Sequence, residues 1–150
     1  EINWLFKQEI CFEKGDFLIY ILDTNIISYI IRNRDFKIVD KFEEVSNNHI
    51  VGISSITIAE LYYGIRKKGN VKLEALINEF LLPLERYSFD EKSAFEYGSI
   101  RYQLELKGEI IGSNDLLIAA HTKSLDATLV TNNTKEFKRV ENLLIENWIS

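Results

Sequence analysis

Short runs of successive apolar residues alternate along the chain with longer stretches in which apolar residues recur every three or four positions. The short runs cover residues 17–22, 49–55, 127–133 and 143–148, and residues 87–90 form a further short extended stretch. Runs of this length predict β-strands. Because they are apolar at successive positions, they predict strands buried on both faces, as in a parallel sheet.

Helical spacing fills the intervals between these strands. We expect helices over residues 26–31, 35–45, 56–69, 72–81, 91–107 and 113–125. The last of these is apolar on most sides, so we expect it to be buried. Strands alternating with helices predict the α/β class, with a central, mostly parallel sheet covered by helices on both faces.

Composition and length favour one compact domain. The 150 residues are 46% hydrophobic and include a single Pro, and a chain of this length buries roughly two thirds of its unfolded surface. No apolar run reaches the roughly 18 residues that a membrane span needs. Cys11 is the only cysteine, which excludes an intrachain disulfide and a cysteine zinc site and favours a cytoplasmic protein.

The formal net charge of -5 argues against a broad cationic surface for nucleic acid. It does not exclude a nucleic-acid enzyme, because carboxylates gathered around metal ions make the metal-free protein more negative. The short basic cluster Arg66, Lys67 and Lys68 is able to meet phosphates. Its alternative interpretation is a solvated helix end, where cations are favoured by the helix dipole.

Four acidic residues lie where a predicted strand ends or a predicted helix begins: Asp23, Glu60, Asp115 and Glu136. Each has a local explanation. Asp23 suits a turn or N-cap, Glu60 has capping-box spacing from Thr57, Asp115 falls in a first helical turn, and Glu136 has cap-like spacing from Asn133. Taken singly, none of the four requires a function.

Their shared position changes that interpretation, since all four places lie at the carboxyl edge of a parallel sheet, where open sheets bind ligands. Carboxylates brought together repel one another unless a cation is present. Oxygen ligands without His or Cys suit Mg²⁺ or Mn²⁺ rather than zinc, and we expect His49 and His121 to be structural. Carboxylate-bound Mg²⁺ indicates phosphoryl chemistry, in which the ion activates water and stabilises charge.

Four segments carry a resemblance to a known family: YILDTNIISYII (20–31), ISSITIAELYYGI (53–65), IGSNDLLIAAHTKSLDATLVTNNTKEF (111–137) and RVENLLIENW (139–148). From about residue 18 to residue 148 the chain resembles the PIN-domain ribonucleases and, within them, the VapC toxins of bacterial toxin-antitoxin pairs. The resemblance implies a PIN-like three-layer α/β/α sandwich.

The same resemblance implies the roles of individual residues. Asp23, Glu60 and Asp115 would hold Mg²⁺ or Mn²⁺, and Glu136 would complete the site. Many PIN domains have Asp where this chain has Asn133, which is therefore expected as a polar neighbour. Further polar residues expected around the metal and the phosphate are Thr24, Asn25, Asn114 and Thr131.

The implied activity is metal-dependent endonucleolysis of RNA that inhibits translation. Similar toxins cleave transfer RNA, in particular the anticodon loop of the initiator tRNA. The implied partners are an RNA substrate, a VapB-type antitoxin, and a second copy of the chain in a homodimer that assembles further with the antitoxin. No membrane partner is expected.

Residues 1–17 depart from the family pattern, and we expect the PIN domain to cover residues 18–150. The extension is interpreted as upstream sequence read in frame, an expression remnant, or an antitoxin-like tail, whose Trp4, Phe6, Phe12 and Phe17 would serve as aromatic anchors. Completion of the core by these aromatics is the alternative.

Two other classes of protein compete with the nuclease interpretation. A haloacid-dehalogenase-like phosphatase also has Asp after its first strand, but it needs a second Asp at the position of Asn25. A non-catalytic nucleotide-binding module needs a Gly-rich loop after that strand, and none is present. Within the nuclease interpretation, DNA remains an alternative substrate.

Overall fold

The computed structural model describes residues 17–33 and 35–149. Its centre is a five-stranded, entirely parallel sheet of order β3-β2-β1-β4-β5. The strands are β1 (Ile19–Leu22), β2 (Ile50–Ser54), β3 (Glu85–Tyr87), β4 (Thr128–Val130) and β5 (Leu144–Glu146). The α/β class and the parallel sheet are therefore confirmed.

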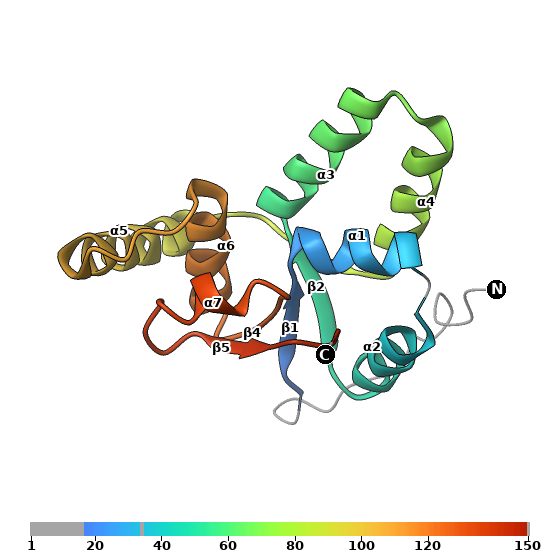
Figure 1. The fold of residues 1–150 in the computed structure, drawn as a ribbon. Helices are drawn as coiled ribbons and strands as arrows, with labels where there is room; N and C mark the ends of the chain where they lie inside the picture. The colour runs from blue at the N-terminus through green and yellow to red at the C-terminus, as the bar shows by residue number, and fades with distance from the viewer. Residues whose placement is uncertain (1–16, 34, 150) are drawn as a thin grey trace.

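Helices cover both faces of the sheet (Figure 1). One face carries α1 (Thr24–Asn33), α2 (Phe36–Asn48), α3 (Ser55–Lys68) and α4 (Val71–Leu81). The other face carries α5 (Glu91–Lys107), α6 (Ser113–Ser124) and α7 (Thr134–Phe137). The predicted three-layer α/β/α sandwich is what the chain forms.

The central strand shows why its sequence is apolar at every position. Tyr20 and Leu22 point into the core under α1 to α4, whereas Ile21 belongs to the core under α5 and α6. Both cores exclude water, so neither face of β1 tolerates a polar side chain. The predicted strand therefore stays apolar until Asp23, the first residue past its carboxyl end.

Three local predictions need correction. The extended stretch predicted at residues 87–90 is instead β3 at Glu85–Tyr87, an edge strand whose Glu85 and Arg86 are exposed and therefore leave no apolar run. Helix α7 was not predicted, because four residues are too few to show a helical period. Helix α1 begins at Thr24, directly after Asp23.

Close strand packing explains one glycine. A Cβ atom on Gly52 of β2 would lie 2.8 Å from the backbone oxygen of Glu85 and 2.6 Å from the ring of Tyr87. Any larger residue would push β3 away from the sheet.

The long helix α5 follows its predicted bounds but presents two of its aromatic residues, Phe95 and Tyr102, outward. Phe95 and Tyr102 are 76% and 60% exposed, while Ile100 and Leu104 face the core.

In the described residues, no helix has the length and apolarity that crossing a bilayer requires. The predicted boundary between an extension and the PIN domain falls at residue 17, so residues 1–16 of that extension lie outside the described residues.

Candidate functional site

Asp23 is buried at the carboxyl end of the central strand, with 3% of its surface exposed. Its backbone N–H donates to the Val130 oxygen at 3.0 Å, which extends the pairing of β1 with β4 by one residue. Its carboxylate accepts the Thr24 N–H at 2.7 Å on Oδ1 and the Thr131 hydroxyl at 2.8 Å on Oδ2. A helix cap accepts the second or third N–H of the helix, so these contacts are not those of a cap.

Burial raises the pKa of the Asp23 carboxyl, and the hydrogen bonds from Thr131 and Thr24 oppose that shift. Two fixed donors, and no cation among the described residues, thus partly offset the cost of burying the charged form. Desolvation of an anion without a counter-charge is unfavourable. A cation bound at this edge of the sheet would therefore stabilise the buried carboxylate.

A chain of hydrogen bonds connects Asp23 with two further acidic residues. The Thr131 oxygen accepts the Asn133 N–H at 3.0 Å. The Asn133 side chain stands at the start of α7 without capping it. Its Nδ2 instead donates to Asp115 Oδ2 at 3.4 Å and to Glu136 Oε2 at 3.2 Å. One amide therefore holds the carboxylates of two helices at a common place.

Asp115, in the first turn of α6, carries the most perturbed carboxyl of the site. Burial, a hydrogen bond to Glu136 and the negative charges of Asp23, Glu136 and Glu60 raise the pKa of Asp115 to about 7. Protonated Asp115 donates to Glu136, whose pKa is lowered by this bond and by Asn133. Near neutral pH, the proton between the two carboxyls reduces their mutual repulsion, as a bound cation would.

Glu60 extends from the second turn of α3, and the capping-box explanation for it is wrong. Ser54 is the N-cap of α3, because its hydroxyl accepts the Ile56 N–H at 3.1 Å. Thr57 lies inside the helix. Burial raises the pKa of Glu60, the charge of Asp23 raises it further, and the neighbouring Thr24 hydroxyl opposes the shift. Glu60 Oε1 and Thr24 Oγ1 are both buried and, in the described parts of the chain, neither has a hydrogen-bond partner.

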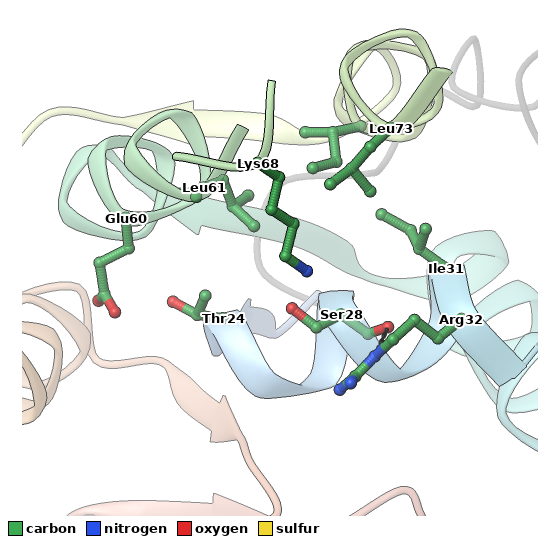
Figure 2. Close-up of a pocket in the computed structure, with 10 residues that line it drawn as sticks. Thr24, Ser28, Ile31, Arg32, Glu60, Leu61, Lys68 and Leu73 are labelled. Atoms are coloured by element: carbon green, nitrogen blue, oxygen red, sulfur yellow. Dashed lines mark hydrogen bonds between the residues drawn. The ribbon is translucent and has the colours of Figure 1, made fainter. Parts of the chain in front are cut away.

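A cavity of about 250 Å³ extends from these two orphaned oxygens between α1, α3 and α4. Figure 2 shows Glu60 and Thr24 near one end, with the cationic groups of Lys68 and Arg32 beside Ser28, and with Ile31 and Leu73 on the far side. Within residues 17–33 and 35–149, neither cation forms an ion pair. The cavity therefore joins an acidic end to two cations.

Two predicted polar residues stand apart from this network. Asn25 and Asn114 are exposed, and neither side chain hydrogen-bonds to another described residue. The two histidines have structural contacts, as expected. His49 Nδ1 accepts the Leu18 N–H at 3.0 Å. The buried His121 ring lies 2.7 Å from Ser54 Oγ and packs edge-on against Phe89.

The donor set fits a hard divalent cation. In the described portion of the chain, no group of three or more acidic, His or Cys side chains is arranged as a formed metal site. The candidate ligand atoms at the sheet edge are nevertheless all oxygens, and one of them is the unpartnered Glu60 Oε1. Burial, together with the neighbouring negative charges, raises the pKa of Asp115. Mg²⁺ and Mn²⁺ prefer such ligands.

Sequence reasoning overlooked two side chains near this site, Ser54 and Arg32. Ser54 and His121 connect the start of α3 with α6, the helices that carry Glu60 and Asp115. A polar residue at the end of a predicted strand was the available signal for Ser54. Arg32 lies in the last turn of α1 and had no distinguishing signal, whereas Lys68 belonged to the basic cluster already noted.

Comparison with known proteins agrees with the fold and identifies the family. The PIN domain family model matches residues 20–143. Ribonuclease VapC2 of Rickettsia felis is 48% identical over 132 residues, which span 87% of this chain and 98% of that protein. The tRNA(fMet)-specific endonuclease VapC of Salmonella typhimurium is 36% identical over 130 residues, which span 86% and 97% of the two chains.

Among solved structures, VapBC2 from Rickettsia felis bound to a DNA fragment from its promoter superposes with a TM-score of 0.85 at 47% identity. The match covers 87% of this chain and 99% of that one. The family model, these relatives and the parallel sheet agree. The chain belongs to the PIN-domain family and, within it, to the VapC ribonucleases.

Proposed function

We propose that the chain is a metal-dependent endoribonuclease and the toxin of a toxin-antitoxin pair, which hydrolyses RNA phosphodiesters and thereby inhibits translation. The observation that carries this proposal is the buried Asp23, linked through Thr131 and Asn133 to Asp115 and Glu136 in a chain of the VapC family. A phosphatase of the haloacid-dehalogenase type and a non-catalytic module have no comparable support.

In this proposal Asp23, Glu60, Asp115 and Glu136 hold Mg²⁺ or Mn²⁺. PIN-domain ribonucleases are generally dependent on divalent metals, and the ion supplies activation of water and stabilisation of charge on the phosphate. Thr131 keeps the Asp23 carboxylate in one orientation through its 2.8 Å hydrogen bond.

The proton on Asp115 sets a condition for metal loading. Because the pKa of Asp115 is about 7, the carboxyl has to release its proton to solvent before it binds a cation. Asn133 remains bonded to Asp115 and Glu136 and keeps both carboxyls in place. The polar groups of Thr24, Asn25 and Asn114 then face the substrate phosphate.

The proposed substrate is tRNA, with the anticodon loop of the initiator tRNA as the specific target. The support is the relative from Salmonella typhimurium, which is a tRNA(fMet)-specific endonuclease. We place the catalytic domain at residues 18–150 and the activity in the cytoplasm.

The proposed inhibitor is a VapB-type antitoxin, supported by the likeness to toxin-antitoxin complexes. An Arg or Lys of the antitoxin lies against the carboxylates and substitutes electrostatically for the metal. The toxin forms a homodimer, and toxin and antitoxin assemble into a larger hetero-oligomer.

The test is cleavage of labelled total RNA, initiator tRNA and single-stranded DNA by pure protein, with Mg²⁺ and with EDTA. We expect Mg²⁺-dependent cleavage of RNA, enriched at the initiator tRNA, and loss of cleavage in Asp23→Asn. This isosteric change keeps the shape and removes the charge. Cleavage that persists in EDTA, or in Asp23→Asn, would refute the metal mechanism. Equal cleavage of DNA would refute the RNA assignment.

A further inference from the structure

The cavity between α1, α3 and α4 has cationic groups that the metal mechanism does not use. We propose that this cavity is a phosphate subsite, in which Lys68 and Arg32 bind the RNA backbone next to the bond that is cleaved. The inference rests on the proposed ribonuclease function and names the residues that hold its substrate.

The two cations come from different helices, and both line the cavity beside Ser28. Lys68 is the last residue of α3, and Arg32 lies in the last turn of α1. Arg32 Nε donates to the Ser28 oxygen at 3.3 Å, which leaves the terminal nitrogens of the guanidinium for a ligand. Figure 2 shows both charged groups beside Ser28.

Neither cation has a carboxylate partner among the described residues, and both line one cavity together with Glu60 of the proposed metal site. Arg101 lies 3.1 Å from Glu105, and Lys107 lies 4.0 Å from Glu141. No such contact exists for Lys68 or Arg32 among the residues that the structure describes. In a chain with a net charge of -5, two unpaired cations in one cavity attract an anion.

The acidic end of the cavity indicates which anion is expected. Glu60 lines the cavity and belongs to the proposed metal site, and the neighbouring Thr24 hydroxyl is buried without a partner. A single small anion does not extend from the metal site to both cations. An RNA strand does, because it presents one phosphate to the metal and the next phosphates along the strand.

The floor of the cavity suits the rest of a nucleotide. Ile31, Leu61, Leu73 and Ile77 supply an apolar surface on which a base or ribose face can pack. Gly64 lies on the same wall, and a Cβ added there would meet nothing within 4 Å. A Cβ at position 64 therefore meets no clash, a larger side chain there occupies cavity space, and the change removes a glycine from a helix.

The first experiment measures steady-state cleavage of a short single-stranded RNA containing one cleavage site, as a function of salt. For Lys68→Ala and for Arg32→Ala we expect KM to rise about tenfold, the effect of losing one charge-assisted hydrogen bond, with kcat within about twofold. The slope of log(kcat/KM) against log salt falls in magnitude by about 0.7 per lost cation. Lys67→Ala removes an exposed neighbouring charge outside the cavity and leaves KM and slope unchanged.

The second experiment tests the space rather than the charge. Gly64→Leu is expected to raise KM about tenfold while preserving the melting temperature. Gly98→Leu is the matched control, because Gly98 lies in α5, also has nothing within 4 Å of an added Cβ, and does not line the cavity. Unchanged KM in both Lys68→Ala and Gly64→Leu would overturn the subsite.

RNA binding separates failure of the subsite from failure of the ribonuclease function. Each substitution is repeated in an Asp115→Asn background, and fluorescence anisotropy measures the affinity for labelled single-stranded RNA. A tenfold loss on Lys68→Ala supports the subsite even if the parent protein cleaves no RNA. Unchanged RNA affinity combined with weaker inhibition by the antitoxin would assign the cavity to a peptide and overturn the proposal.

Discussion

Replacing Asp115 by Asn is expected to stabilise the metal-free protein, and only at neutral or alkaline pH. Asp115 is half-buried among the negative charges of Asp23, Glu136 and Glu60, and its pKa is about 7. The unfolded chain releases the same proton near pH 3.8. Between these values the folded state binds more protons, so the free energy of unfolding falls as pH rises from about 4 to about 7.

The size of this effect follows from the two pKa values. A difference of 7 minus 3.8, about 3 units, corresponds to about 4 kcal/mol at about 1.4 kcal/mol per unit. Asp115 is partly exposed, and screening by solvent reduces the penalty to about 1–2 kcal/mol. Asn has no proton to lose and its amide is still able to donate to Glu136. The variant therefore gains this amount at pH 8 and nothing at pH 4.

The assay is urea unfolding of both proteins in EDTA at pH 4, 6 and 8, repeated at pH 8 with Mg²⁺. We expect the two unfolding energies to coincide at pH 4 and to separate at pH 8, where the melting temperature of the variant is about 5 °C higher. Added Mg²⁺ stabilises the wild type by mass action and reverses the order. A variant that is equally destabilised at pH 4 and pH 8 would refute the repulsion argument.

Three further substitutions test individual contacts. Asp23→Ala should be no less stable than wild type in EDTA and should lose the Mg²⁺-induced rise in melting temperature; a constant loss of about 1 kcal/mol in both conditions would mark a cap. Thr131→Val removes the 2.8 Å hydrogen bond to Asp23 and should weaken Mn²⁺ binding, measured by calorimetry, about tenfold; unchanged affinity contradicts an orienting role. His121→Phe breaks the contact with Ser54 and should cost about 1–3 kcal/mol in urea unfolding. Ser54→Ala combined with it should add only the loss of the α3 N-cap, about 1 kcal/mol, and therefore less than Ser54→Ala costs alone; full additivity would show that the two residues act separately.

The fold was predictable from the sequence wherever local pattern and tertiary environment agree. Buried strands such as β1 and β4 are apolar on both faces, and α5 ends at a glycine in the left-handed conformation, Gly108 with φ of 66°. The edge strand β3 could not be placed correctly, because exposed residues carry no apolar signal. The direction in which α5 faces was also undetermined, since both of its sides contain apolar residues.

The acidic residues of the candidate site were predictable from the sequence, but the hydrogen bonds that join them were not. The carboxyl edge of a parallel sheet places Asp23 and Asp115 in the same region whatever the details of packing. That Asn133 bridges Asp115 and Glu136, and that Thr131 holds Asp23, depends on side-chain orientations between residues far apart in the chain. The closeness of Arg32 and Lys68 in the cavity depends on how α1 packs against α3, and the sequence of neither helix alone predicts that packing.

A crystal of the protein soaked in Mn²⁺, with diffraction recorded at the manganese absorption edge, locates the metal directly. We expect an anomalous peak bounded by carboxylate oxygens of Asp23, Glu60, Asp115 and Glu136, with Asp115 deprotonated and no longer donating to Glu136, and no peak in crystals of Asp23→Asn. A peak at any other place, or none at a Mn²⁺ concentration that supports RNA cleavage, would contradict the assignment of these carboxylates as the metal site.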